Sequence, residues 1–204
     1  MSISEKLTQL NGIKQDIKQA IIDKGQAATD DMTEYSTLIS NISGSSDDSF
    51  KNAIERNGNP VNLPSDLTKI GNYAFYYNSS LNLTSLPDGV TSIDSSAFYG
   101  CTNLSLTSLP SGITSIGSNA FYGCTNLALT SLPDSLTNIG SNAFSNCSSL
   151  TTLTFKGTPT TISSTAFSNC DNLTTINVPW SEGAVANAPW GATNATINYD
   201  YVGG

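Results

Sequence analysis

The chain has 204 residues, a net charge of −8 and only 12% charged residues, and it contains no histidine. Lysine and arginine are absent between Lys69 and Lys156, so the clustered cations of a nucleic-acid groove are missing and we expect no nucleic-acid partner. No apolar run approaches the ~20 residues of a membrane span, and the N-terminus lacks the basic and apolar regions of a cleaved signal, so we expect no membrane insertion and no secretion by such a signal.

Residues 1–42 have the pattern of two amphipathic helices, which we interpret as an attachment module. Ser2 with Glu5, and Asp31 with Glu34, form capping boxes ahead of two apolar stripes. The stripes can cover each other in a helical hairpin, or they can dock on another protein or on identical heads of a homo-oligomer. The apolar residues that we assign to attachment are Leu7, Leu10, Ile17, Ile21, Tyr35, Leu38 and Ile42.

Two short segments connect this module to the rest of the chain. Residues 43–49 are rich in serine, glycine and aspartate, which is the composition of a flexible linker. Residues 50–60 indicate a short helix with Phe50, Ala53 and Ile54 on one side. Because the terminal units of repeat proteins need a cover, we expect this helix to cap the first repeat.

A unit of 23 residues recurs through residues 61–178. One unit cannot bury its own apolar face, so a fixed period of this length predicts coils that stack around one continuous core. The predicted fold class is therefore an α/β repeat solenoid with short parallel strands. The residues that return at this spacing are Phe75, Phe98, Phe121, Phe144 and Phe167, with Ile70, Ile93, Ile116, Ile139 and Ile162, and with Leu81, Leu104, Leu127, Leu150 and Leu173.

Each unit divides into four predicted parts. Residues 86–89 carry proline at the second position of a turn, where its fixed φ fits. Residues 91–93 indicate a short strand, residues 95–98 a short helical or 3₁₀ turn, and residues 104–109 a second strand. We expect the apolar residues to point inward and threonine, serine and asparagine to line the outside.

The stretch IGSNAFYGCTNLALTSLP at residues 116–133 resembles the BspA-type, or Treponema pallidum-type, leucine-rich repeat. The resemblance covers residues 61–178 and implies a leucine-rich repeat solenoid. The first three units space their leucines as Leu81-x-Leu83-x-x-Leu86, whereas the fourth has the usual Leu150-x-x-Leu153-x-Phe155.

The two ends of the chain carry weaker resemblances. Residues 179–204 break the period and contain Trp180 and Trp190, so we interpret them as a C-terminal cap, similar to tails that close such repeats in proteins of gut bacteria and their phages. The head at residues 1–42 resembles a short N-terminal module of phage tail and fibre proteins, on the pattern of residues 17–25 and the helix that follows.

Four cysteines occupy one position of the repeat. The simplest interpretation is a row of small buried apolar side chains, although a bridge between neighbouring coils is not excluded by distance alone. The first unit has Asn78 at this position, and the cysteines are Cys101, Cys124, Cys147 and Cys170.

The sequence predicts no catalytic, cofactor-binding or metal-binding residues. Without histidine, a hydrolase of the Ser-His or Cys-His type is excluded, because the commonest general base is missing. Aspartates such as Asp88 and Asp134 lie at turns, where turn propensity explains them. A glycosidase with paired carboxylates stays possible only in principle, because no spacing brings two carboxylates together.

Tyrosines form the candidate binding surface. Tyr76, Tyr99 and Tyr122 share one repeat position and should form a row, with Tyr73 and Tyr77 widening it at one end. Such a row can hold a glycan or a protein partner, or each ring can simply pack over its own coil. A polar strand face offers a second surface for recognition or plain solvation, and it comprises Asn82, Thr84, Ser105, Thr107, Thr130, Thr154 and Thr175.

These features favour a non-enzymatic protein of the phage virion surface, in a tail or head fibre. Its helical head would bind other virion proteins, and its repeats would bind a glycan or protein on the host surface. The alternative is a BspA-like adhesin of the bacterial cell surface, for which a signal or wall anchor would be needed.

Overall fold

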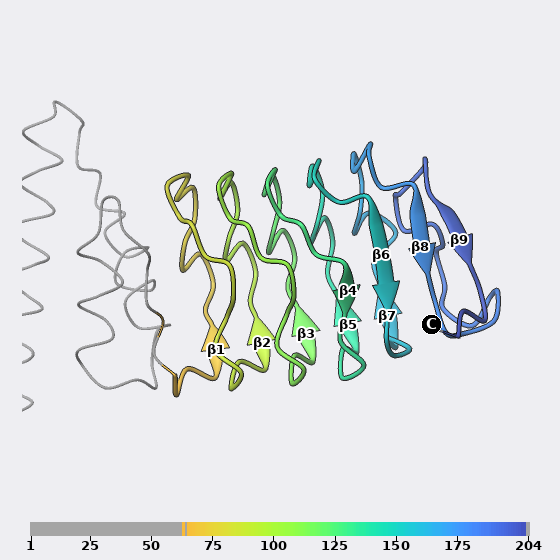
Figure 1. Cartoon of the computed structure of the whole chain (residues 1–204), viewed down its shortest axis with the longest axis horizontal. Helices are drawn as coiled ribbons and strands as arrows, with labels where there is room; N and C mark the ends of the chain where they lie inside the picture. Colours follow the sequence, from red (N-terminus) through yellow and green to blue (C-terminus); the bar gives the residue numbers. More distant parts are fainter. Residues whose placement is uncertain (1–62, 64, 203–204) are drawn as a thin grey trace, which may run out of the picture. The chain divides into compact units, whose positions relative to one another are not determined.

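The computed structural model describes residue 63 and residues 65–202, which form a stack of coils (Figure 1). Two parallel sheets run along the stack. The five-stranded sheet contains, in spatial order, β1 (Lys69–Ile70), β2 (Ser92–Ile93), β3 (Ser115–Ile116), β5 (Asn138–Ile139) and β7 (Thr161–Ile162). The four-stranded sheet contains β4 (Ser131–Leu132), β6 (Thr152–Phe155), β8 (Thr175–Asn177) and β9 (Thr196–Asn198).

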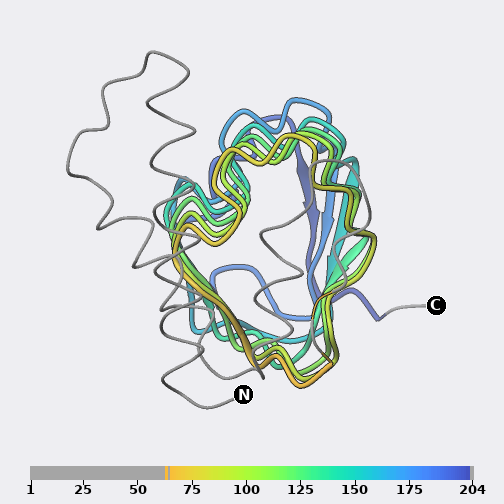
Figure 2. The same cartoon turned by 90° about the vertical axis from the view of Figure 1, so that its left-hand side faces the viewer.

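The predicted period sets the register of the five-stranded sheet. Ile70 lies opposite Ile93 and Ile93 opposite Ile116, one repeat unit apart, so identical residues stack upon one another. Figure 2 looks along the stack and shows successive coils nearly superimposed. The parallel-strand solenoid predicted from the 23-residue period is therefore confirmed.

A column of phenylalanine rings fills the core. The rings of Phe98, Phe121, Phe144 and Phe167 are fully buried, and neighbouring centroids in the column lie 5.2–5.3 Å apart with nearly parallel planes. This spacing follows from the distance between hydrogen-bonded coils, which brings equivalent side chains within contact of each other. The column joins all the coils into one core.

The helical part of the predicted α/β fold class is wrong for the described residues, which contain no helix. Where we expected a helical or 3₁₀ turn at 95–98, the chain makes a turn over residues 95–100. Ser96 and Gly100 have φ values of 56° and 70°, which a right-handed helix does not allow. The N–H of Phe98 donates instead to the carbonyl of Ala120 in the next coil, at 2.8 Å. The helices predicted within 1–42 and 50–60 lie outside the described residues.

The second strand predicted at 104–109 is also absent. The four-stranded sheet begins only at β4, in the third unit. In the first unit, Leu81, Leu83 and Leu86 are all buried at spacings of two and then three residues. A strand buries alternate residues, and Leu153 and Phe155 of β6 satisfy that alternation. The altered leucine spacing of the early repeats thus departs from the pattern of a strand, and in the third unit, which shares this spacing, β4 covers only two residues.

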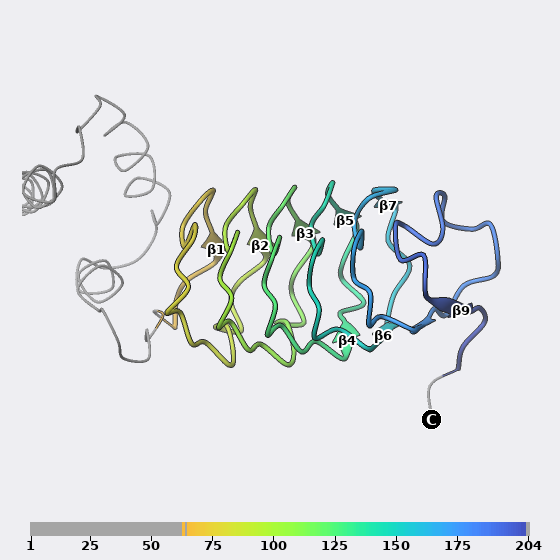
Figure 3. The same cartoon turned by 90° about the horizontal axis from the view of Figure 1, so that it is seen from above.

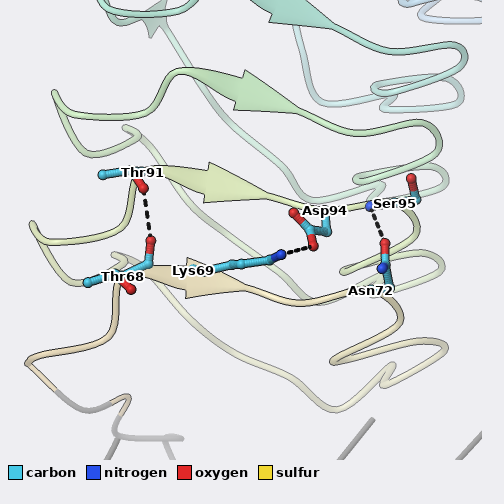
Figure 4. Close-up of polar contacts among 6 residues, drawn as sticks. All are labelled: Thr68, Lys69, Asn72, Thr91, Asp94 and Ser95. Carbon is cyan, nitrogen blue, oxygen red and sulfur yellow. Dashed lines mark hydrogen bonds and ion pairs between the residues drawn. The ribbon is translucent and has the colours of Figure 1, made fainter. Parts of the chain in front are cut away.

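Polar contacts between adjacent coils repeat along the outside of the stack. Figure 4 shows three of them between the first two coils. The hydroxyl of Thr91 donates to the carbonyl of Thr68 at 3.1 Å, and the N–H of Ser95 donates to Oδ1 of Asn72 at 3.0 Å. The third is the ion pair between Lys69 and Asp94. The contact with Asn72 satisfies a backbone N–H just beyond the very short strand β2.

The last described residues pack on the end of the core. Trp190 is fully buried, and its carbonyl accepts a hydrogen bond from the N–H of Phe167 at 2.9 Å. Trp180 is also buried, with its ring 5.3 Å from that of Phe155. In Figure 3, β9 lies beyond β6 and β7 at this end of the row. That residues 179–204 act as a cap stays a prediction, and these contacts are the reason for it.

Candidate functional site

The tyrosine cluster, defined as Tyr73, Tyr76, Tyr77, Tyr99 and Tyr122, lies on the turns that follow β1, β2 and β3. Its members come from three successive turns, at residues 72–77, 95–100 and 118–123. The structure brings all five predicted rings together, with centroids of neighbours 4.6–5.4 Å apart. The same position holds Ser145 and Ser168 in the next two coils, so the row ends there.

Exposure divides the cluster into two parts. Tyr73, Tyr76 and Tyr77 expose 47%, 44% and 61% of their surface, whereas Tyr99 and Tyr122 are half-buried. The ring of Tyr99 stacks on that of Tyr122, with centroids 4.6 Å apart and planes 9° apart. Each of these two rings therefore covers one face of the other. The surface available to a ligand is therefore concentrated on the first turn.

Two exposed tyrosines have an unusual backbone conformation. Tyr73 has φ 57° and Tyr77 has φ 55°, in the left-handed region that bulky residues rarely adopt. At the position of Tyr77 the later coils carry Gly100, Gly123 and asparagine, which tolerate this region. A bulky residue in such a conformation costs stability, so these two rings are more easily explained by binding than by folding.

The ring of Tyr77 packs against the backbone of Gly100. A Cβ atom at residue 100 would lie 2.6 Å from Cδ1 and 3.0 Å from Cε1 of Tyr77, so only glycine leaves room for the ring. Gly123 is the equivalent glycine in the next coil. Apart from its two chain neighbours, the nearest atom to a Cβ at residue 123 would be Cα of Gly100, at 3.9 Å. Sequence reasoning missed Gly100, although the change from tyrosine to glycine in one repeat column was visible.

The rings also influence each other's hydroxyl groups. The pKa of Tyr99 is raised to about 12, mainly by loss of solvent around its hydroxyl and to a smaller extent by its hydrogen bond with Tyr77. Its hydroxyl therefore stays protonated at neutral pH and can both donate and accept hydrogen bonds. The cluster offers flat apolar rings with uncharged polar rims.

The threonine row beside the five-stranded sheet uses its hydroxyl groups within the protein. The hydroxyls of Thr91, Thr114 and Thr137 donate to carbonyls of the preceding coil at 2.9–3.1 Å. On the polar strand face, Ser105 bonds to Asn82 and Asn177 to Thr154. These hydroxyl and amide groups are therefore already engaged within the protein.

Charge is sparse around the cluster. Lys69 forms an ion pair with Asp94, with Nζ 2.7 Å from Oδ2 (Figure 4). The next cation along the chain is Lys156. Within the described part of the chain, no group of histidine, cysteine, aspartate and glutamate is placed to hold a metal ion, and no helix is long and apolar enough to cross a membrane.

The four cysteines form a buried row of free thiols. Each Sγ donates to the carbonyl of the column phenylalanine one coil earlier, for example from Cys101 to Phe75 at 2.9 Å and from Cys147 to Phe121 at 3.1 Å. Burial raises the pKa of Cys101 to about 12 and that of Cys170 to about 11, and it raises the pKa of Cys147 well above 9.0. The prediction of a row of small buried side chains is confirmed.

These raised pKa values predict a loss of stability in alkali. Unfolded thiols ionise near the ordinary value of 9.0, whereas the folded thiols of Cys101 and Cys170 stay protonated to higher pH. The unfolded state therefore releases protons first, and the free energy of unfolding should be constant below about pH 8 and fall from about pH 9 upward. Urea unfolding across this range measures the slope. Replacing all four cysteines with alanine should flatten it, and an unchanged slope would contradict the assignment.

The residues predicted for attachment, from Leu7 to Ile42, lie outside the described residues. Their role therefore stays a prediction, as does that of the linker at 43–49. The described part of the chain contributes one candidate surface, the tyrosine cluster.

Comparisons with known proteins agree with this architecture. No curated protein matches the chain. Among solved structures, a leucine-rich repeat protein from T. pallidum is 31% identical with a TM-score of 0.50, covering 57% of this chain and 56% of its own. A leucine-rich repeat protein from Bacteroides ovatus is 33% identical with a TM-score of 0.47, covering 56% of this chain and 30% of its own. The pneumococcal vaccine antigen PcpA is 23% identical with a TM-score of 0.50, and the match covers 76% of this chain and 43% of PcpA.

The chain thus spans between 30% and 56% of the length of these structures. The model of the BspA type leucine rich repeat region matches residues 68–187 in six copies. This match covers more than half of the sequence and includes every tyrosine of the cluster. The protein therefore belongs to the BspA-type leucine-rich repeat family.

Proposed function

We propose that this protein is a non-enzymatic adhesin of the bacterial cell surface, which binds its target through the tyrosine cluster. The observation that carries the proposal is the exposure of Tyr73, Tyr76 and Tyr77 on an otherwise polar and nearly uncharged solenoid. Contiguous exposed aromatic groups of this kind mark interaction sites. Membership of the BspA-type family supports display outside the cell.

The absence of histidine supports a role without catalysis. The carboxylates of Asp88 and Asp134 are exposed at turns, and that of Asp94 is paired with Lys69. Paired carboxylates across a substrate cleft, as glycosidases need, are not among these groups. The proposal therefore assigns the repeats to recognition.

A virion surface protein is the second candidate. It is favoured by residues 1–42, whose sequence resembles a module of phage tail and fibre proteins, and by the linker composition of residues 43–49. In that case the helical head would join other virion proteins and the repeats would project outward. Mass spectrometry of purified virions, compared with surface proteolysis of intact bacteria, distinguishes the two locations.

Adhesion assays with the full chain test the binding role in either location. Replacing Tyr73, Tyr76 and Tyr77 together with serine should reduce binding to target cells at least about tenfold, because most exposed ring surface is removed. The matched control replaces Thr84, Thr107 and Thr130 with alanine on the polar strand face and should bind normally. If the tyrosine variant binds as well as the wild type, or if only the control loses binding, the cluster is not the adhesive surface.

A further inference from the structure

We propose, on the basis of this adhesive function, that the tyrosine cluster binds an uncharged glycan and that the outer face of Tyr77 stacks against one of its sugar rings. Tyr77 is the most exposed ring of the cluster, at 61%. The negative face of an aromatic ring attracts groups with partial positive charge, and the C–H bonds on the flat side of a pyranose are such groups.

Three neighbours position the ring of Tyr77 and leave most of it exposed. Cδ1, Cε1 and Cγ of Tyr77 all lie within 3.4 Å of the point where a Cβ of residue 100 would stand, so the ring lies over the backbone of Gly100. Tyr76 and Tyr99 meet it at interplanar angles of 85° and 60°, with centroids 4.7 and 5.1 Å away. These neighbours and Gly100 position the ring, of which 61% stays exposed to solvent.

The size of the exposed surface fits a short stretch of sugar rings better than a protein partner. Complete burial of a tyrosine removes roughly 150–250 Å² from solvent, so the exposed fractions of Tyr73, Tyr76 and Tyr77 together offer on the order of 300 Å². A stable protein interface buries about 800 Å² on each partner. The cluster is well below that area.

The charges near the cluster exclude acidic ligands. No lysine or arginine lies between Lys69 and Lys156, the chain carries a net charge of −8, and Lys69 is already paired with Asp94. Among residues 65–202, a sulfated or uronic-acid polysaccharide, or a phosphate, would find no free cation beside the rings. The tyrosine hydroxyls, including the protonated hydroxyl of Tyr99, can hydrogen-bond the hydroxyls of a neutral sugar.

Two glycines provide a matched pair of variants for the test. Gly100 and Gly123 both have φ 70°, so Gly100→Ala and Gly123→Ala carry the same backbone penalty. Only a Cβ at residue 100 would clash with the ring of Tyr77, because it would lie 2.6 Å from Cδ1. The nearest atom to a Cβ at residue 123 would be 3.9 Å away. Gly100→Ala therefore displaces the ring of Tyr77 without removing any tyrosine. Thermal unfolding of both variants checks that their stabilities match.

The experiment is affinity electrophoresis of the full chain in native gels that contain β-glucan, mannan, xylan or α-glucan, with polygalacturonate as the acidic comparison. We expect at least one neutral polysaccharide to retard the wild type and Gly123→Ala equally. Tyr77→Ala and Gly100→Ala should weaken that retardation about tenfold or more. The proposal is overturned if no neutral polysaccharide retards the wild type, if polygalacturonate retards it as strongly, or if Gly123→Ala loses as much as Gly100→Ala.

Treatment of the target cells separates this inference from the adhesive function on which it rests. Adhesion that is lost after periodate oxidation of surface glycans, and survives protease treatment, supports a glycan ligand. Adhesion that survives periodate and is lost after protease overturns the glycan inference and leaves the adhesive function standing. A full chain that adheres to no tested cell contradicts the adhesive function itself.

Discussion

Replacing Phe121 with alanine should lower the free energy of unfolding by about 3–5 kcal/mol. Its ring is fully buried and stacks between those of Phe98 and Phe144, each at a centroid distance of 5.3 Å. Rigid coils on both sides share backbone hydrogen bonds with its own coil, so they cannot collapse into the space that alanine leaves. Urea unfolding followed by circular dichroism measures the loss.

Phe75→Ala is the matched control, because the same change is made at the start of the same column. Among the described residues the ring of Phe75 stacks only on Phe98, and Phe75 is slightly exposed, at 7%. Its replacement should therefore cost clearly less than that of Phe121. A loss below about 1 kcal/mol at Phe121 would show that the column does not stabilise the stack.

Much of the fold could be predicted because the repeat is nearly exact. The constant spacing of 23 residues determines which side chains lie next to each other in adjacent coils. The structure accordingly pairs Ile93 with Ile116 and stacks Phe98 on Phe121. In a solenoid, each coil contacts only its neighbours, so one spacing determines every strand pairing in the five-stranded sheet. The buried thiols follow from the same argument.

Local backbone geometry was harder to predict. The stretch at 95–98 is compatible with a helical turn in sequence, yet Ser96 and Gly100 are left-handed and the N–H groups bond to the next coil. Periodicity reports which side chains are buried, and it does not report which neighbour satisfies the backbone. The strand expected at 104–109 is missing too, and the buried Leu106 and Leu109 stand three residues apart, which departs from the alternation of a strand.

The sequence identified which tyrosines form the candidate site, but it did not predict how these rings stack or which of them are exposed. The repeat column identified Tyr76, Tyr99 and Tyr122, but stacking of Tyr99 on Tyr122 leaves most exposed surface on the first turn. Tyr73 and Tyr77, which the sequence placed only at the margin, supply two of the three exposed rings. Their left-handed conformation depends on contacts with the next coil that no single repeat reveals.

Replacing Tyr77 with asparagine should weaken adhesion about tenfold or more, because the most exposed ring is lost, while leaving the protein at least as stable as the wild type. A bulky residue at φ 55° costs about 1–2 kcal/mol, and asparagine adopts this region more easily. Asn146 and Asn169 already stand at the equivalent position with φ 60° and 58°. Because the ring of Tyr77 is mostly exposed, its removal sacrifices little burial. Thermal unfolding and the adhesion assay measure the two effects on the same sample.

Tyr76→Asn is the matched control for the role of backbone strain. Tyr76 belongs to the same turn and is similarly exposed, but it is not among the residues with positive φ. Its replacement should therefore weaken adhesion without any gain in stability. A Tyr77→Asn variant that melts well below the Tyr76→Asn variant would show that the Tyr77 ring serves the fold, since folding would then depend on the ring despite its strained backbone. Full adhesion by Tyr77→Asn would equally contradict the role assigned to this ring, because a binding residue held at a cost in stability should not be dispensable for binding.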